Sequence, residues 1–136
     1  MNELSIEIKQ NYTKAFKWFE KAPNIGAAQH FLGMMYEDRI GVKQDLKKAV
    51  TCYEEAIQLG RREAKNNLGL CYFNGWGVKK DYKTAFEIFS EAAEENDSAA
   101  MRNLASMYSQ GLGTEKDRAK ANELYKKAAS IGYSHY

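Results

Sequence analysis

The chain carries an apolar stripe with helical spacing that recurs along its length. Its first instance places Ala28, Leu32 and Tyr36 at i, i+4 and i+8, on one face of a helix. The residue beside the stripe is glycine or alanine in every instance, which lets another backbone approach closely. The pattern predicts three helices of one type, called helix A here, over residues 28–38, 64–74 and 100–110.

A second stripe follows each helix A and alternates small and large side chains. In Ala49, Tyr53 and Ala56 the spacing is i, i+4 and i+7, again one face of a helix. The same pattern returns twice, at Ala85, Phe89, Ala92 and at Ala121, Tyr125, Ala128. The alanines allow near neighbours close access, and we expect the aromatic ring to fill the space between them. We call these segments helix B.

The segments between the two helix types contain the residues that end one helix and begin the next. Glycines in the left-handed backbone conformation can end helix A and turn the chain. They stand at Gly41, Gly77 and Gly113. An aspartate follows each glycine by four residues, at Asp45, Asp81 and Asp117. Aspartate can accept hydrogen bonds from the first free amides of a helix, so we expect these residues to be the N-caps of helix B.

All these columns keep a spacing of 36 residues, so the chain is an internal repeat. A shorter copy opens the chain, because residues 6–11 echo residues 40–45, and Ala15, Phe19 and Ala22 follow at a spacing of 34. Residues 6–11 are therefore expected to form the loop before a helix B. We expect a single repeat domain over 1–136, made of a half-repeat 6–26 and repeats 27–62, 63–98 and 99–134. Each helix pair buries its stripe only when the next pair stacks on it, which is the organisation of a solenoid.

Composition narrows the classes of partner. Hydrophobic residues make up 44% of the 136 residues and there is one proline, as in a folded domain. The formal charge is +2 with the signs interleaved, so nucleic acid is not an expected partner. No apolar stretch approaches the ~20 residues of a membrane span, and the opening residues are charged where a signal peptide is apolar. We expect no membrane partner and a cytoplasmic location, while a fragment of a longer or exported protein also fits.

The cysteines and histidines are too few for a disulfide framework or a metal site. Cys52 and Cys71 match no compact zinc-ligand pair, and His30 and His135 are the only histidines. Two interpretations of the cysteines stay open: two buried reduced thiols, or a bridge between adjacent helices. No metal or cofactor is expected.

The repeated columns closely resemble the Sel-one-like repeat family, a relative of the tetratricopeptide repeats with a period near 36. The second full copy matches best, through Ala64, Leu68, Gly69, Tyr72, Gly75, Gly77, Val78, Asp81, Ala85, Phe89 and Ala92. Departures from the pattern are Glu7, Arg39, Asn96, Ala105 and Thr114. The resemblance implies an all-α fold, a right-handed α/α superhelix (solenoid) of about three and a half helix-turn-helix repeats. It also implies an adaptor or scaffold that presents a concave surface to a protein or peptide.

In the related tetratricopeptide repeats, helix A lines the concave surface. Three positions of each helix A point away from its stripe, and we call these nine the partner-face residues. They are His30, Met34, Glu37, Asn66, Leu70, Phe73, Arg102, Ser106 and Ser109. A peptide with an apolar anchor and an acidic or carboxylate group would suit this mixture. In the alternative interpretation, Met34, Leu70 and Phe73 simply pack against neighbouring helices.

Catalysis is not expected. Some cysteine-rich relatives have been linked to β-lactam binding or hydrolysis, but they carry a cysteine pair in each repeat, and this chain has two cysteines in all. It also lacks S-x-x-K and K-T-G motifs and any glycine-rich phosphate loop. A β-lactamase-like hydrolase is therefore the weakest alternative. A stronger one is self-assembly, as a homo-oligomer or as part of a larger repeat protein, because solenoid ends without polar caps expose apolar faces.

Overall fold

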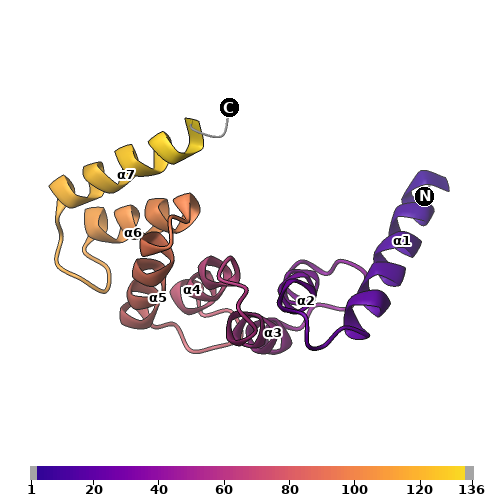
Figure 1. Cartoon of the computed structure of the whole chain (residues 1–136). Coiled ribbons are helices and arrows are strands. Elements are labelled where there is room, and N and C mark those ends of the chain that lie inside the picture. Colours follow the sequence, from indigo (N-terminus) through magenta and orange to yellow (C-terminus); the bar gives the residue numbers. More distant parts are fainter. Residues whose placement is uncertain (1–2, 134–136) are drawn as a thin grey trace. The chain divides into compact units, whose positions relative to one another are not determined.

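The computed structural model describes residues 3–133, and within that range all regular secondary structure is helical (Figure 1). The helices are α1 (Glu3–Glu20), α2 (Gly26–Asp38), α3 (Leu46–Gln58), α4 (Ala64–Asn74), α5 (Tyr82–Glu94), α6 (Ser98–Gln110) and α7 (Arg118–Tyr133). The expected all-α repeat fold is confirmed. The chain divides into two compact units, residues 1–64 and 65–136. His135 and the last residue of the expected repeat 99–134 lie outside the described residues.

The predicted helices A and B are present. Helix A corresponds to α2, α4 and α6, of which α4 has the expected bounds and the other two begin two residues earlier than expected. Helix B corresponds to α3, α5 and α7, each of which begins directly after a predicted capping aspartate. Within the second unit, α6 packs against both α5 and α7.

Aspartates cap the helices as the sequence predicts. The carboxylates of Asp45, Asp81 and Asp117 each accept a hydrogen bond from the backbone N–H three residues further on, at 3.0–3.1 Å. Asp97 caps α6 in the same way, accepting from the Ala100 N–H at 3.1 Å. Asp97 is a fourth cap, in addition to the three that the repeat pattern predicts.

Helix ends that lack glycine use other residues in the left-handed conformation. Gly111 ends α6 with φ 68°, whereas Arg39 ends α2 with φ 58°. Asn96, after α5, has φ 66°, as expected from the tolerance of asparagine for this conformation. Arginine has no such tolerance, so Arg39 is a locally strained residue.

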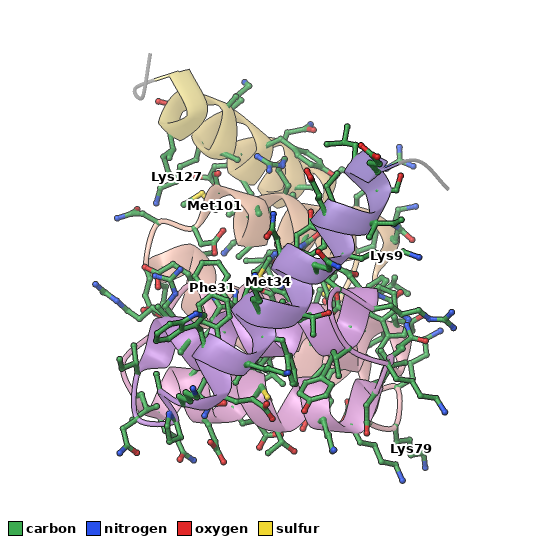
Figure 2. All side chains as sticks on the ribbon, turned by 90° about the vertical axis from the view of Figure 1, so that its right-hand side faces the viewer. Lys9, Phe31, Met34, Lys79, Met101 and Lys127 are labelled. Carbon is green, nitrogen blue, oxygen red and sulfur yellow. The ribbon has the colours of Figure 1, made fainter. Side chains whose placement is uncertain are left out.

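The expected loop over residues 6–11 is wrong, because these residues are part of α1. Lys9, in the middle of the segment, is helical and extends outward as an exposed side chain (Figure 2). The two later loops contain paired glycines with positive φ, including Gly75 and Gly77. Residues 6–11 contain no glycine to stop the helix. Asn11 consequently lies inside α1 and is not a cap.

The helix A glycines let the aromatic rings of helix B enter the core. A Cβ atom on Gly33 would lie 2.6 Å from Cε1 of Tyr53, and one on Gly69 would lie 2.5 Å from Cε1 of Phe89. Both rings are 0% exposed. The core cluster of the second unit is built around Phe89 and consists otherwise of Ala85, Ala92, Ala93, Ala100, Met101, Leu104, Met107 and Ala128.

The third aromatic ring of this column departs from the expectation. Tyr125 is 41% exposed, so its ring does not fill an interior space as Tyr53 and Phe89 do. In this repeat Ala105 stands where the other two have glycine, and it is fully buried. No helix follows α7 within the described residues to cover Tyr125.

Candidate functional site

In the second unit, α4 and α6 present six of the nine partner-face residues. Five of them, Asn66, Leu70, Phe73, Ser106 and Ser109, are half-buried, and Arg102 is exposed. A hydrogen bond joins the two helices directly, because Asn103 Nδ2 donates to Asn66 Oδ1 at 2.8 Å. The two helices therefore form one continuous surface.

A hollow of about 110 Å³ lies on this surface. Leu70 and Phe73 line it from α4, and Asn103 and Ser106 line it from α6. The buried ring of Phe89 on α5 completes the lining. The hollow thus combines three apolar side chains with two polar ones, the composition of a site that takes an apolar group and orients it by hydrogen bonds.

The two asparagines keep hydrogen-bonding capacity beyond the bond that joins them. A carboxamide has an NH2 donor and a carbonyl acceptor. The bond uses the carbonyl of Asn66 and the NH2 of Asn103, and leaves the NH2 of Asn66 and the carbonyl of Asn103 to be satisfied elsewhere. A peptide backbone offers the complementary acceptor and donor.

Asn103 is not among the predicted partner-face residues, because it stands one position away from the predicted face of helix A. Its counterpart one repeat earlier is Asn67, next to Asn66. The asparagine at this position in two successive helices A, Asn67 and Asn103, is the sequence signal that could have identified it.

Ser106 and Arg102 lie one turn apart on α6. The Ser106 hydroxyl accepts a hydrogen bond from Gln110 Nε2 at 2.8 Å, which leaves its proton for another acceptor. Arg102 is exposed and precedes Ser106 by four residues, so its guanidinium emerges on the same side of α6. A cation thus stands beside the hollow.

The packing interpretation of the apolar partner-face residues applies to Leu70 and Phe73, whereas their contact with a partner stays a prediction. Leu70 and Phe73 pack against the core cluster, and the Phe73 ring lies 5.2 Å from that of Tyr82. Both side chains nevertheless line the hollow. They support the core and form a surface at once.

In the first unit, the three partner-face residues differ in accessibility. Met34, labelled in Figure 2, is half-buried. His30 is only 7% exposed, contrary to the exposed position expected from its helix register. Arg61 Nε donates to His30 Nδ1 at 3.1 Å, and the imidazole packs edge-on to the Tyr53 ring at 6.0 Å. The His30 side chain therefore makes its contacts within the first unit.

Glu37 is half-buried and accepts a hydrogen bond from the Tyr53 hydroxyl at 3.1 Å. Burial raises the pKa of this carboxyl above its ordinary value, and the Tyr53 hydrogen bond partly opposes the shift. Glu37 therefore interacts with helix B and with solvent.

The described residues provide neither a metal-ligating cluster nor a disulfide. Among them, no group of three or more histidine, cysteine, aspartate or glutamate side chains could hold a metal ion. Neither cysteine forms a disulfide, and Cys71 is buried while Cys52 is half-buried. Of the helices between residues 3 and 133, none is long and apolar enough to cross a membrane.

Comparison with known proteins gives a consistent family match. The family model for the Sel1 repeat matches residues 1–22, 26–60, 62–97 and 98–133. None of the curated proteins compared matches the chain.

Three solved structures are similar to the chain. A Sel1 repeat protein from Oxalobacter formigenes is 33% identical with a TM-score of 0.84 over 88% of this chain and 49% of its own. The protective antigen c5321 of uropathogenic Escherichia coli, which has an SLR fold, is 37% identical with a TM-score of 0.83 over 89% of this chain and 26% of its own. Cysteine rich protein B of Helicobacter pylori is 25% identical with a TM-score of 0.70, over 92% of this chain and 91% of its own.

The chain spans about half the length of the first of these proteins and about a quarter of the second. Sel1 repeat proteins are generally protein-interaction modules and are typically non-catalytic. Four matched repeats cover nearly all of the sequence, and the capped helix pairs described above follow the same register. The chain belongs to the Sel1 repeat family.

Proposed function

We propose that this protein is a non-catalytic interaction module that binds a peptide segment of a partner protein on the exposed surface of α4 and α6. The surface consists of Asn66, Leu70, Phe73, Arg102, Ser106 and Ser109, together with Asn103. Met34 and Glu37 are proposed as partner contacts of the first unit by itself. His30 is proposed to contribute indirectly, through its bond with Arg61.

The observation that carries the proposal is the hollow between α4 and α6. Three of its five lining residues, Leu70, Phe73 and Ser106, are partner-face residues selected from the repeat register alone. Polar groups suited to a peptide backbone border it, and an exposed cation lies one turn away. Partner sites on proteins commonly combine an apolar centre with a polar rim in this way.

A peptide selection experiment tests the proposal. A phage-displayed library of random dodecapeptides would be panned against the wild-type protein. The selected peptides would then be measured by fluorescence anisotropy against the double variant Asn66→Ala, Arg102→Ala. We expect binding to weaken at least tenfold, since the variant loses a backbone contact and a charge.

The matched control is Asn122→Ala, Lys126→Ala, which likewise removes one carboxamide and one positive charge, from exposed positions of α7. It should leave peptide binding unchanged. Circular dichroism should show native helix content in both variants, although loss of the Asn66–Asn103 bond costs about 1 kcal/mol. Equal binding of the selected peptides by both double variants would place the site elsewhere and contradict the proposal.

A further inference from the structure

We infer that the hollow between α4 and α6 accepts one branched aliphatic side chain of the bound peptide, that of leucine, isoleucine or valine, with an acidic residue of the same peptide beside it. This inference rests on the proposed function and specifies the chemistry of the partner.

The size of the hollow selects the anchor. An apolar cavity of about 150 Å³ is large enough to hold one benzene molecule. The hollow here measures about 110 Å³. A branched aliphatic group fits this volume, whereas a phenylalanine or tryptophan ring requires the walls to move. Alanine leaves most of the volume empty.

The walls of the hollow resist such movement. The Phe73 ring is held against Tyr82 at 5.2 Å, and Phe89 is fully buried against Gly69. Asn103 is fixed by its bond to Asn66. Since a packed wall adapts poorly to a larger group, the site discriminates against aromatic anchors.

The polar groups around the hollow orient the rest of the peptide. The free carbonyl of Asn103 can accept from a backbone N–H, and the free NH2 of Asn66 can donate to a backbone C=O. These bonds hold an extended backbone across the opening, with the anchor directed inward. Arg102, exposed one turn before Ser106, then faces a neighbouring residue of the peptide. Its guanidinium favours a carboxylate there.

An anchor scan tests this inference without altering the protein. Acetylated hexapeptides on an array would carry leucine, isoleucine, valine, methionine, alanine, phenylalanine or tryptophan at one central position. An aspartate would stand one or two residues before or after it, and asparagine would replace it in a second set. We expect leucine, isoleucine and valine peptides to bind about tenfold or more tighter than alanine, phenylalanine and tryptophan peptides. The asparagine set should bind more weakly.

A variant that fills the hollow provides the second test. Ser106→Leu should reduce binding of the leucine peptide by about tenfold or more. Ser130→Leu makes the same change at an exposed position of α7 and should have no effect. Circular dichroism identifies a misfolded variant, in which case the anchor scan alone decides.

The outcomes separate the inference from the proposed function. Equal binding of all anchors, a preference for phenylalanine or tryptophan, or no loss in a folded Ser106→Leu protein would overturn the inference. Library-selected peptides that bind through the α4 and α6 surface would still support the proposed function. If no array peptide binds while the selected peptides do, the inference is again wrong. If neither group binds, both fall.

Discussion

Gly69 lies directly under the ring of Phe89, so closely that a Cβ atom on the glycine would be 2.5 Å from Cε1 of the ring. The contact joins a helix A to a helix B within the second unit. Because the ring is fully buried in the core cluster, an added methyl group on the glycine would have to displace it from its packed position.

Replacing this glycine should destabilise the protein. We expect Gly69→Ala to lower the free energy of unfolding by about 1–3 kcal/mol, since an extra methyl group forces the packed ring to shift. Urea unfolding followed by circular dichroism measures the change. Gly132→Ala is the control, because a Cβ at that helical position meets nothing within 4 Å. It should leave stability unchanged or raise it by up to about 1 kcal/mol.

Relief of the strained helix end should have the opposite effect. Arg39 has φ 58°, a conformation that costs a non-glycine residue about 1–2 kcal/mol. Glycine removes that cost but adds about 0.5–1 kcal/mol of unfolded-chain entropy. Arg39→Gly should therefore stabilise the protein by about 0.5–1 kcal/mol in thermal or urea unfolding. Asn96→Gly, at φ 66°, should gain less because asparagine already tolerates this conformation. An equal gain at both positions would contradict this account of Arg39.

Thiol reactivity should be low in the folded protein. Burial raises the pKa of Cys52 from 9.0 to about 11, and the negative charge of Glu55 is a smaller cause in the same direction. At pH 8 only about one Cys52 in a thousand is then a thiolate, the reactive form. Cys71 is 1% exposed. Labelling with Ellman's reagent at pH 8 should be slow for both thiols and complete in denaturant. A thiol that reacts natively as fast as free cysteine would show that this part of the fold opens readily.

The raised pKa of Glu37 predicts a pH dependence of stability. The folded state favours the protonated Glu37 carboxyl. The stability that this protonated group contributes is fully present below its ordinary pKa of 4.5 and is lost as pH rises through the folded-state pKa. Glu37→Gln stays neutral and keeps an acceptor for Tyr53. We expect the variant to match the wild type at pH 4 and to unfold at higher denaturant concentration at pH 7. Glu54→Gln, at an exposed position of α3, should not change the difference in unfolding midpoint between pH 4 and pH 7.

The sequence predicts most of the fold because short-range signals mark it. The aspartate caps and loop glycines act within a few residues, and the structure confirms both at the predicted positions. The same logic explains the error over residues 6–11. There the repeat register suggests a loop, but the local residues lack the glycines that make one, and the local preference prevails.

The partner-face residues were less predictable, because the repeat register gives the direction in which a side chain leaves its helix and not how exposed that side chain is. Leu70, Phe73 and Ser106 were selected from helix spacing alone, and all three line the hollow. His30 occupies the same register as Asn66 but is buried, because Arg61, 31 residues further along the chain, reaches it. A long-range contact of this kind leaves no periodic trace in the sequence. Asn103 was missed for a related reason, since only its bond to Asn66 reveals its role.

The helix A glycine and the buried helix B ring occur together in the first two repeats, and the third repeat, with Ala105 and Tyr125, departs in both columns. Where the glycine is present, the ring 20 residues further along the chain is fully buried, and where alanine stands instead, Tyr125 is 41% exposed. A glycine-to-alanine exchange in either of the first two repeats would place a Cβ atom within 2.6 Å of the ring, so a duplicated repeat can keep its buried aromatic side chain only while it keeps this glycine.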